Sequence, residues 1–165
     1  MLSDSYIEQA IKARPGKDYY SRMSAPLIVA IIGAISVLFI GILGVFIFAI
    51  GIYLFMSNAG KGQMEYEYIL TNGSVEIAAI YNASKRKELM NFEMEQVTMI
   101  VPKDSERIAT ENFAKKRDYS SRTDKGQVIS LVVEVNGSRE LVSIEPDERT
   151  MAHIKSYARN KMYDL

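Results

Sequence analysis

The sequence contains no cysteine among its 165 residues. This absence excludes a disulfide framework, and it excludes zinc or iron–sulfur sites that depend on thiolate ligands. The chain also has no excess of charge, because 20 lysines and arginines balance 20 aspartates and glutamates. A neutral chain has no overall field that attracts nucleic acid. We therefore expect no nucleic-acid partner.

Charged residues are absent from the 34 residues between Ser24 and Ser57. A signal peptide is a poor interpretation, because the apolar run is too long and begins only after 23 residues of polar character. A soluble core helix of this length would show a polar face, and this segment has none. The expected partner of residues 24–57 is therefore the lipid bilayer, which makes the chain an integral membrane protein.

The apolar segment can be read as one helix or as two. One helix of 34 residues would rise ~51 Å, against a hydrocarbon core of ~30 Å. Two arms of about 15 residues would each rise only ~23 Å. Gly41 and Gly44 lie near the middle, where a turn needs a permissive backbone. Gly33 and Gly51 flank them, where small residues let two helices approach closely. The glycines favour two short transmembrane helices with a turn near 41–44.

The basic residues around this segment indicate its orientation. Four of them precede it, namely Lys12, Arg14, Lys17 and Arg22. By the positive-inside rule they place the N-terminus in the cytoplasm. A hairpin would return the C-terminal domain to the cytoplasmic side of the cell membrane, whereas a single span would place it outside. Lys61 is the only basic residue after the segment until Lys85, and this asymmetry slightly favours a single span.

Residues 1–23 are predicted to be a basic cytosolic leader. Ile7, Ala10 and Ile11 would lie on one face of a short helix that ends at Pro15. Such a helix could also serve as a docking peptide or lie on the membrane surface.

Residues 63–165 are predicted to form a soluble domain, because apolar and polar residues alternate there. Strands are expected over 65–70, 75–81, 87–92, 96–101, 128–135 and 139–144. Asn72-Gly73 and Asn136-Gly137 mark hairpin turns. Residues 103–127 are polar and unpatterned, with a helix expected near Ser105–Lys116. A terminal helix is expected from Pro146 to about Lys161, with an apolar stripe of Met151, Ile154, Tyr157 and Ala158.

The expected fold class is α+β. An N-terminal transmembrane helical hairpin would precede an antiparallel β-roll of six or seven strands in meander order. The C-terminal helix would cover the open end of the curved sheet. This outline is that of a pleckstrin-homology-like (PH-like) domain.

Several short motifs resemble a family of small membrane proteins from Gram-positive bacteria whose activity is uncharacterised. They are Lys12-Ala13-Arg14-Pro15, Tyr68–Gly73, Ile80-Tyr81-Asn82, Ser84–Lys87, Asp118–Ser121 and Glu145–Glu148. The resemblance covers nearly the whole chain. It implies a two-helix membrane segment and a C-terminal PH-like domain in the cytoplasm. It implies no activity and carries no catalytic residues.

Candidate catalytic chemistry is sparse. His153 is the only histidine, and no nucleophile stands at a suitable spacing from it. Glu65 and Glu67, like Glu93 and Glu95, lie two apart, which is typical of the solvated face of a strand rather than of a metal site. The three Asn-x-Ser motifs coincide with predicted turns. With no phosphate-binding loop and no Gly-x-Ser-x-Gly elbow, we expect no enzyme activity, metal or cofactor.

Two basic triplets are the candidate contact sites for lipid or for a partner protein. They are Lys85, Arg86 and Lys87, and Lys115, Lys116 and Arg117. The leading hypothesis is a membrane-anchored interaction or scaffold module, whose sheet edge or loop 103–127 receives a protein partner. The alternatives are a lipid head-group-sensing domain, since basic residues near an anionic leaflet are attracted to it, and a small membrane component that assembles as a homo-oligomer.

Overall fold

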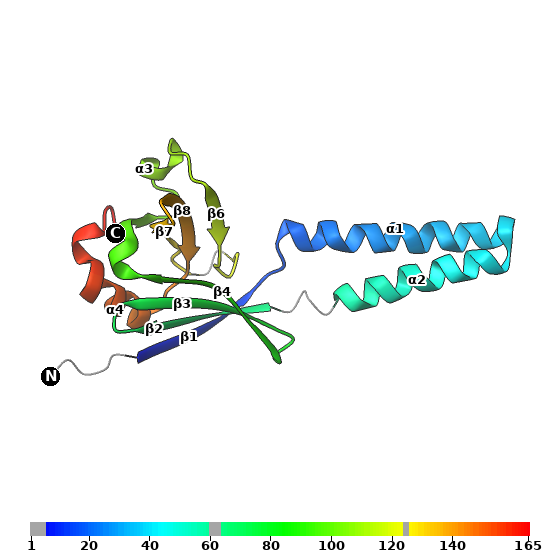
Figure 1. Cartoon of the computed structure of the whole chain (residues 1–165), viewed down its shortest axis with the longest axis horizontal. Helices are drawn as coiled ribbons and strands as arrows, with labels where there is room; N and C mark the ends of the chain where they lie inside the picture. Colours follow the sequence, from blue (N-terminus) through cyan, green and yellow to red (C-terminus); the bar gives the residue numbers. More distant parts are fainter. Residues whose placement is uncertain (1–5, 60–63, 124–125) are drawn as a thin grey trace. The chain divides into compact units, whose positions relative to one another are not determined.

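A computed structural model describes residues 6–59, 64–123 and 126–165 (Figure 1). Lys61 and the first five residues of the predicted leader lie outside the described residues. The chain divides into two compact units. One consists mainly of two long helices, and the other contains the strands and the C-terminal helix.

The helical unit is an antiparallel pair of apolar helices. α1 spans Lys17–Ile40 and α2 spans Ile42–Ala59, so Gly41 alone separates them. Gly41 has a φ of 56°, in the left-handed region that glycine adopts without steric cost. Both helices are long and apolar enough to cross a membrane. The predicted helical hairpin is therefore confirmed.

Small residues let the two helices pack closely. A Cβ atom at Gly33 would overlap the backbone of Phe48, and one at Gly51 would overlap the backbone of Ala30. Gly44 stands equally close to the backbone of Val37. These glycines serve a contact within the chain, in the way that small residues serve helix pairs in membranes.

The predicted helix in the leader is wrong, because Tyr6–Ala13 forms the strand β1. Its side chains alternate between exposed and partly buried positions, with Ile7, Gln9 and Ile11 on the inner face. The side chain of Gln9 donates to the carbonyl oxygen of Glu145 at 2.9 Å and accepts from the backbone N–H of Asp147 at 2.9 Å. The segment therefore follows the two-residue periodicity of a strand, although Ile7 and Ile11 also fit the four-residue spacing of a helix.

The first sheet has the strand order β1-β2-β3-β4. β2 spans Met64–Thr71, β3 spans Ser74–Tyr81 and β4 spans Lys85–Glu93. Asn72 and Gly73 both have positive φ angles, 48° and 91°, as a two-residue hairpin turn requires. The two long helices are inserted in the chain between β1 and β2, which are hydrogen-bonded neighbours in this sheet.

The second sheet has the order β5-β7-β8-β6. β5 spans Val97–Pro102 and follows a 3₁₀ turn over Met94–Gln96, while β7 spans Ile129–Val135 and β8 spans Ser138–Ile144. Residues 103–127 contain the short helix α3, Glu106–Ala109, and the strand β6, Lys115–Asp118, which pairs parallel to β8. The predicted meander order holds in the first sheet and for β5, β7 and β8, whereas β6 departs from it by pairing beyond β8. The longer helix predicted over 105–116 is wrong. The described residues form eight strands in two sheets.

The C-terminal helix α4 spans Glu148–Ala158, and a 3₁₀ turn over Arg159–Lys161 follows it. Asp147 caps α4 by accepting from the backbone N–H of Thr150 at 2.7 Å. Ile154 and Ala158 are buried as predicted, whereas Tyr157 is 42% exposed. α4 contacts β1, the strand that precedes the helical hairpin. The architecture confirms the α+β class with a PH-like domain.

Candidate functional site

Both basic triplets lie on strands at the edges of the sheets. Lys85–Lys87 begin β4, the last strand of the first sheet. Lys115–Arg117 fill most of β6, the last strand of the second sheet. An edge strand exposes a row of backbone groups, and lysines on it discourage unspecific pairing with other chains. The triplets therefore mark two edges of the domain.

In the first triplet, Arg86 is committed to carboxylates of its own domain. Its guanidinium lies 2.6 Å from Glu67 on β2 and 2.6 Å from Glu76 on β3. These hydrogen bonds raise the pKa of Arg86 above its usual value. Lys85 and Lys87 are exposed, and neither has an ion pair with the described residues. Two of the three predicted contact residues are thus available at this edge.

In the second triplet, Glu140 on β8 organises the basic residues. This carboxylate is 5% exposed and lies 2.7 Å from Arg117 and 3.6 Å from Lys115. The hydrogen bond from Arg117 lowers the pKa of Glu140 below its usual value, against the opposing effect of burial. Lys116 lies over the ring of Phe113, with 5.8 Å between its Nζ atom and the ring centroid. The triplet is therefore held in place by β8 and by Phe113.

Glu140→Gln is expected to destabilise the domain by about 1–2 kcal/mol at neutral pH, because Arg117 loses a charged hydrogen-bond acceptor. The native pKa of Glu140 is lowered, so its contribution is present above the unfolded-state pKa and is lost as the pH falls through the native value. Urea denaturation at several pH values should show the difference from wild type shrinking in acid. Glu88→Gln, at an exposed position on β4, is the control. An unchanged difference in acid would contradict this role.

The segment after β6 is tied to the core by hydrogen bonds. Asp118 accepts from the backbone N–H and the hydroxyl of Ser120, and Tyr68 donates to the carbonyl oxygen of Tyr119. Arg122 donates to the hydroxyl of Tyr66 at 2.9 Å. Tyr119 and Ser120 are buried. The motif Asp118–Ser121 therefore fixes this connection, and loop 103–127 is an ordered element of the sheet edge where the structure describes it.

The other residues singled out from the sequence do not form a reaction centre. His153 is 5% exposed, its ring lies 4.9 Å from that of Tyr157, and burial lowers its pKa. Glu67 pairs with Arg86, while Glu93 and Glu95 are exposed. No group of three or more potential metal ligands occurs among the described residues.

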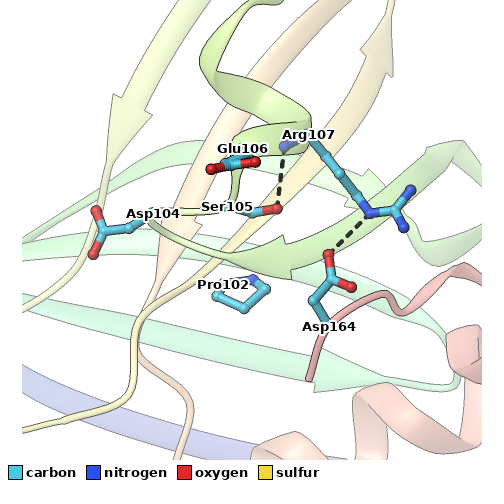
Figure 2. Close-up of a pocket in the computed structure, with 6 residues that line it drawn as sticks. All are labelled: Pro102, Asp104, Ser105, Glu106, Arg107 and Asp164. Atoms are coloured by element: carbon cyan, nitrogen blue, oxygen red, sulfur yellow. Dashed lines mark hydrogen bonds and ion pairs between the residues drawn. The ribbon is translucent and has the colours of Figure 1, made fainter.

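Figure 2 shows an open hollow beside α3, with a volume of about 520 Å³. Its lining residues are Pro102, Asp104, Ser105, Glu106, Arg107 and Asp164. Three of its polar side chains already have partners: Arg107 forms an ion pair with Asp164 at 2.9 Å, and the hydroxyl of Ser105 accepts from the backbone N–H of Arg107. These three side chains are therefore engaged by contacts within the domain.

The feature that the sequence did not indicate is the outer edge of β6. The backbone N–H of Tyr119 donates to the carbonyl oxygen of Ser143 on β8, in line with the register that pairs Asp118 with Ser143. Because backbone groups alternate along a strand, the N–H groups of Lys116 and Asp118 point away from β8. No strand pairs with this side of β6 in the described part of the chain. β6 consists of four charged residues, so its sequence shows no alternation of apolar and polar residues. Only its pairing with β8 in the structure identifies it as a strand.

Comparison with known proteins yields one family. The family described as Bacterial PH-like domain (DUF6106) matches residues 3–164, which is nearly the whole chain. The match confirms the resemblance that the short motifs indicated. No curated protein matches the chain.

Proposed function

The chain belongs to the bacterial PH-like domain family, and on this premise we propose that it is a membrane-anchored interaction module that binds a protein partner rather than catalysing a reaction. The PH-like fold hosts many unrelated functions, so the proposal depends on features of this chain. The observation that carries it is the insertion of the apolar hairpin between two paired strands.

That insertion supports one particular membrane topology. β1 precedes α1 and β2 follows α2, yet β1 and β2 share backbone hydrogen bonds in one sheet. Paired strands must lie in the same compartment. This pairing supports a chain that enters and leaves the bilayer on one side, and it speaks against the single span that the charge asymmetry slightly favoured.

The basic residues support a cytoplasmic location for that side. Lys12 and Arg14 precede the hairpin, and Lys85 and Lys87 belong to the strands after it. Basic residues close to membrane segments are enriched on the cytoplasmic face. In the proposed topology, the N-terminus and the whole PH-like domain lie in the cytoplasm at the cell membrane.

The outer edge of β6 is the proposed binding surface. An extended peptide can add a strand to such an edge through backbone hydrogen bonds, while side-chain contacts select the partner. Lys115 and Lys116 are exposed there, beside the partly buried ring of Phe113. The basic side chains select an acidic segment of the partner protein.

Photo-crosslinking in cells tests this surface. A photoreactive residue at Lys115 should capture a discrete partner, and one at Glu88 on β4 should not. Lys116→Pro removes an outward N–H group, which an edge strand tolerates, and should abolish the crosslink. Lys116→Gln keeps that N–H group and should weaken capture less. Equal capture at both positions, or capture that survives Lys116→Pro, would contradict the proposal.

Lipid head-group binding is the second candidate, and Lys85 and Lys87 favour it. They are exposed at the β3–β4 turn, and β4 is separated from β2 only by β3. A basic residue near an anionic leaflet contributes ~1 kcal/mol. For a domain lacking the hairpin, K85Q together with K87Q should weaken flotation with anionic vesicles by roughly thirtyfold. Equal binding of the wild-type domain to neutral and anionic vesicles would eliminate this candidate.

A further inference from the structure

The turn of the helical hairpin is made entirely of apolar side chains. Leu38 is 84% exposed and Phe39 is 81% exposed, and Ile42 follows directly after Gly41 at 72%. A turn that reached water on the far side of a bilayer would expose all of this apolar surface to it. The free-energy cost would grow in proportion to the apolar area exposed.

The uncharged part of each helix is also shorter than the hydrocarbon core. Met23 to Ile40 and Ile42 to Ala59 are 18 residues each, or ~27 Å. The hydrocarbon core of a bilayer is ~30 Å thick. With Met23 and Ala59 at the near interface, the turn stops ~3 Å before the far interface, and any tilt of the hairpin shortens its reach further.

The tyrosines and basic residues of the hairpin lie toward its open end, and none occurs between residues 31 and 51. Tyr19 and Tyr20 lie near the start of α1, where the hydroxyl of Tyr19 donates to the carbonyl oxygen of Ala59 at 3.0 Å. Arg22 is the last charged residue before the apolar segment. Tyrosine and basic residues mark a membrane–water interface. The turn has neither, so the hairpin has one interface and not two.

We propose that the hairpin is a monotopic anchor, which enters and leaves through one leaflet and holds the Gly41 turn inside the hydrocarbon core. This inference rests on the proposed membrane anchoring and specifies how deep the anchor goes. The occupant of the exposed apolar surface is thus lipid acyl chain on every side, including the tip.

The backbone of the turn suits this environment. Hydrocarbon offers no hydrogen bonds, so irregular backbone exposed to lipid is costly. Here the connection is a single residue, and the N–H of Gly41 donates to the carbonyl oxygen of Val37 at 3.1 Å. The N–H of Gly44 donates to the carbonyl oxygen of Gly41 at 2.9 Å. The hydroxyl of Ser36, the polar side chain closest to the turn, donates to the carbonyl oxygen of Ile32 at 2.7 Å.

The proposed depth of the hairpin limits the side of the membrane from which soluble partners can bind. A monotopic anchor presents no aqueous surface on the far side of the membrane. Every soluble partner must therefore bind on the side that carries the PH-like domain. The chain cannot receive a water-soluble signal from the opposite side through this hairpin.

Spin labels on the full chain in proteoliposomes test the depth. The chain has no cysteine, so Tyr20→Cys, Phe39→Cys and Phe46→Cys each give a single labelling site at an exposed position. Collisions with oxygen report hydrocarbon, and collisions with a nickel chelate report water. We expect residues 39 and 46 to be accessible to oxygen and to lose accessibility to nickel, whereas residue 20 retains accessibility to nickel.

The labelled positions distinguish a failure of the monotopic anchor from a failure of membrane anchoring. Nickel access at residue 39 with none at residue 46 would overturn the monotopic anchor and leave the membrane anchoring intact. Nickel access at both would overturn the membrane anchoring itself. In bilayers of longer acyl chains a tip held in the hydrocarbon core should stay inaccessible to nickel, and nickel access at residue 39 there would also overturn the monotopic anchor.

Discussion

Replacing residues 17–59 by a short Gly/Ser linker is expected to yield a folded, water-soluble PH-like domain. β1 and β2 are adjacent in the sheet, so a short connection can join them once the hairpin is removed. A chain that begins at residue 62 lacks β1 and should be less stable by about 3 kcal/mol or more. It loses the β1 hydrogen bonds and both hydrogen bonds of Gln9, each of which contributes about 1 kcal/mol.

Chemical denaturation of the linked and truncated domains measures this difference. Since small domains are stable by only about 5–15 kcal/mol, the truncated domain should unfold at much lower denaturant concentration. Gln9→Ala in the linked domain should cost about 1–2 kcal/mol. Glu8→Ala is the matched control, because Glu8 is exposed and accepts only from Tyr6 in the described structure. Equal stability of the two domains would show that β1 is dispensable.

Leucine at Gly33, Gly44 or Gly51 is expected to separate the two apolar helices. The added side chain would overlap the backbone of the facing helix, and overlap with backbone cannot be relieved by a rotamer change. The cost should exceed the ~1–3 kcal/mol that is typical of overpacked cores. A hairpin that packs through its glycines should therefore splay at its open end.

Distance measurements between spin labels at Tyr20→Cys and Met56→Cys report this change, because both positions are exposed near the open end. The wild-type background should give one short, narrow distance distribution. Gly44→Leu should lengthen and broaden it, whereas Phe46→Leu, at an exposed position of α2, should leave it unchanged. A narrow distribution in Gly44→Leu would mean that the glycines do not set the helix spacing.

The apolar hairpin could be predicted because its signals are local. An uncharged run longer than one membrane thickness and a central glycine identify two helices and the turn at Gly41. The Asn-Gly turns at residues 72 and 136 can be predicted for the same reason, because a turn with positive φ at two successive positions favours asparagine and glycine. Each of these signals needs only a few neighbouring residues.

The role of β1 could not be read in the same way. Ile7 and Ile11 fit a helical spacing and also a strand, and the deciding contacts of Gln9 lie 136 and 138 residues away in the chain. Local periodicity therefore assigns residues 1–23 to a separate leader, whereas β1 belongs to the first sheet of the domain. Pairing between residues so far apart in the chain cannot be predicted from the periodicity of one segment.

The candidate site was only partly predictable for a related reason. Counting charges identified both basic triplets, yet Arg86 and Arg117 are paired with Glu67 and Glu140, which are remote in sequence. Lys85, Lys87 and Lys116 remain without an ion pair among the described residues. Position on a sheet edge, rather than charge alone, distinguishes the residues that a partner can reach.

Cysteine labelling in the strands before and after the hairpin tests the proposed topology most directly. Lys12→Cys lies before the hairpin and Glu88→Cys lies after it, and both positions are exposed. A membrane-impermeant maleimide applied to right-side-out and to inverted vesicles reports the side of each residue. Both cysteines should react only in inverted vesicles, since paired strands share the cytoplasm. Labelling of the two positions from opposite sides would contradict the topology.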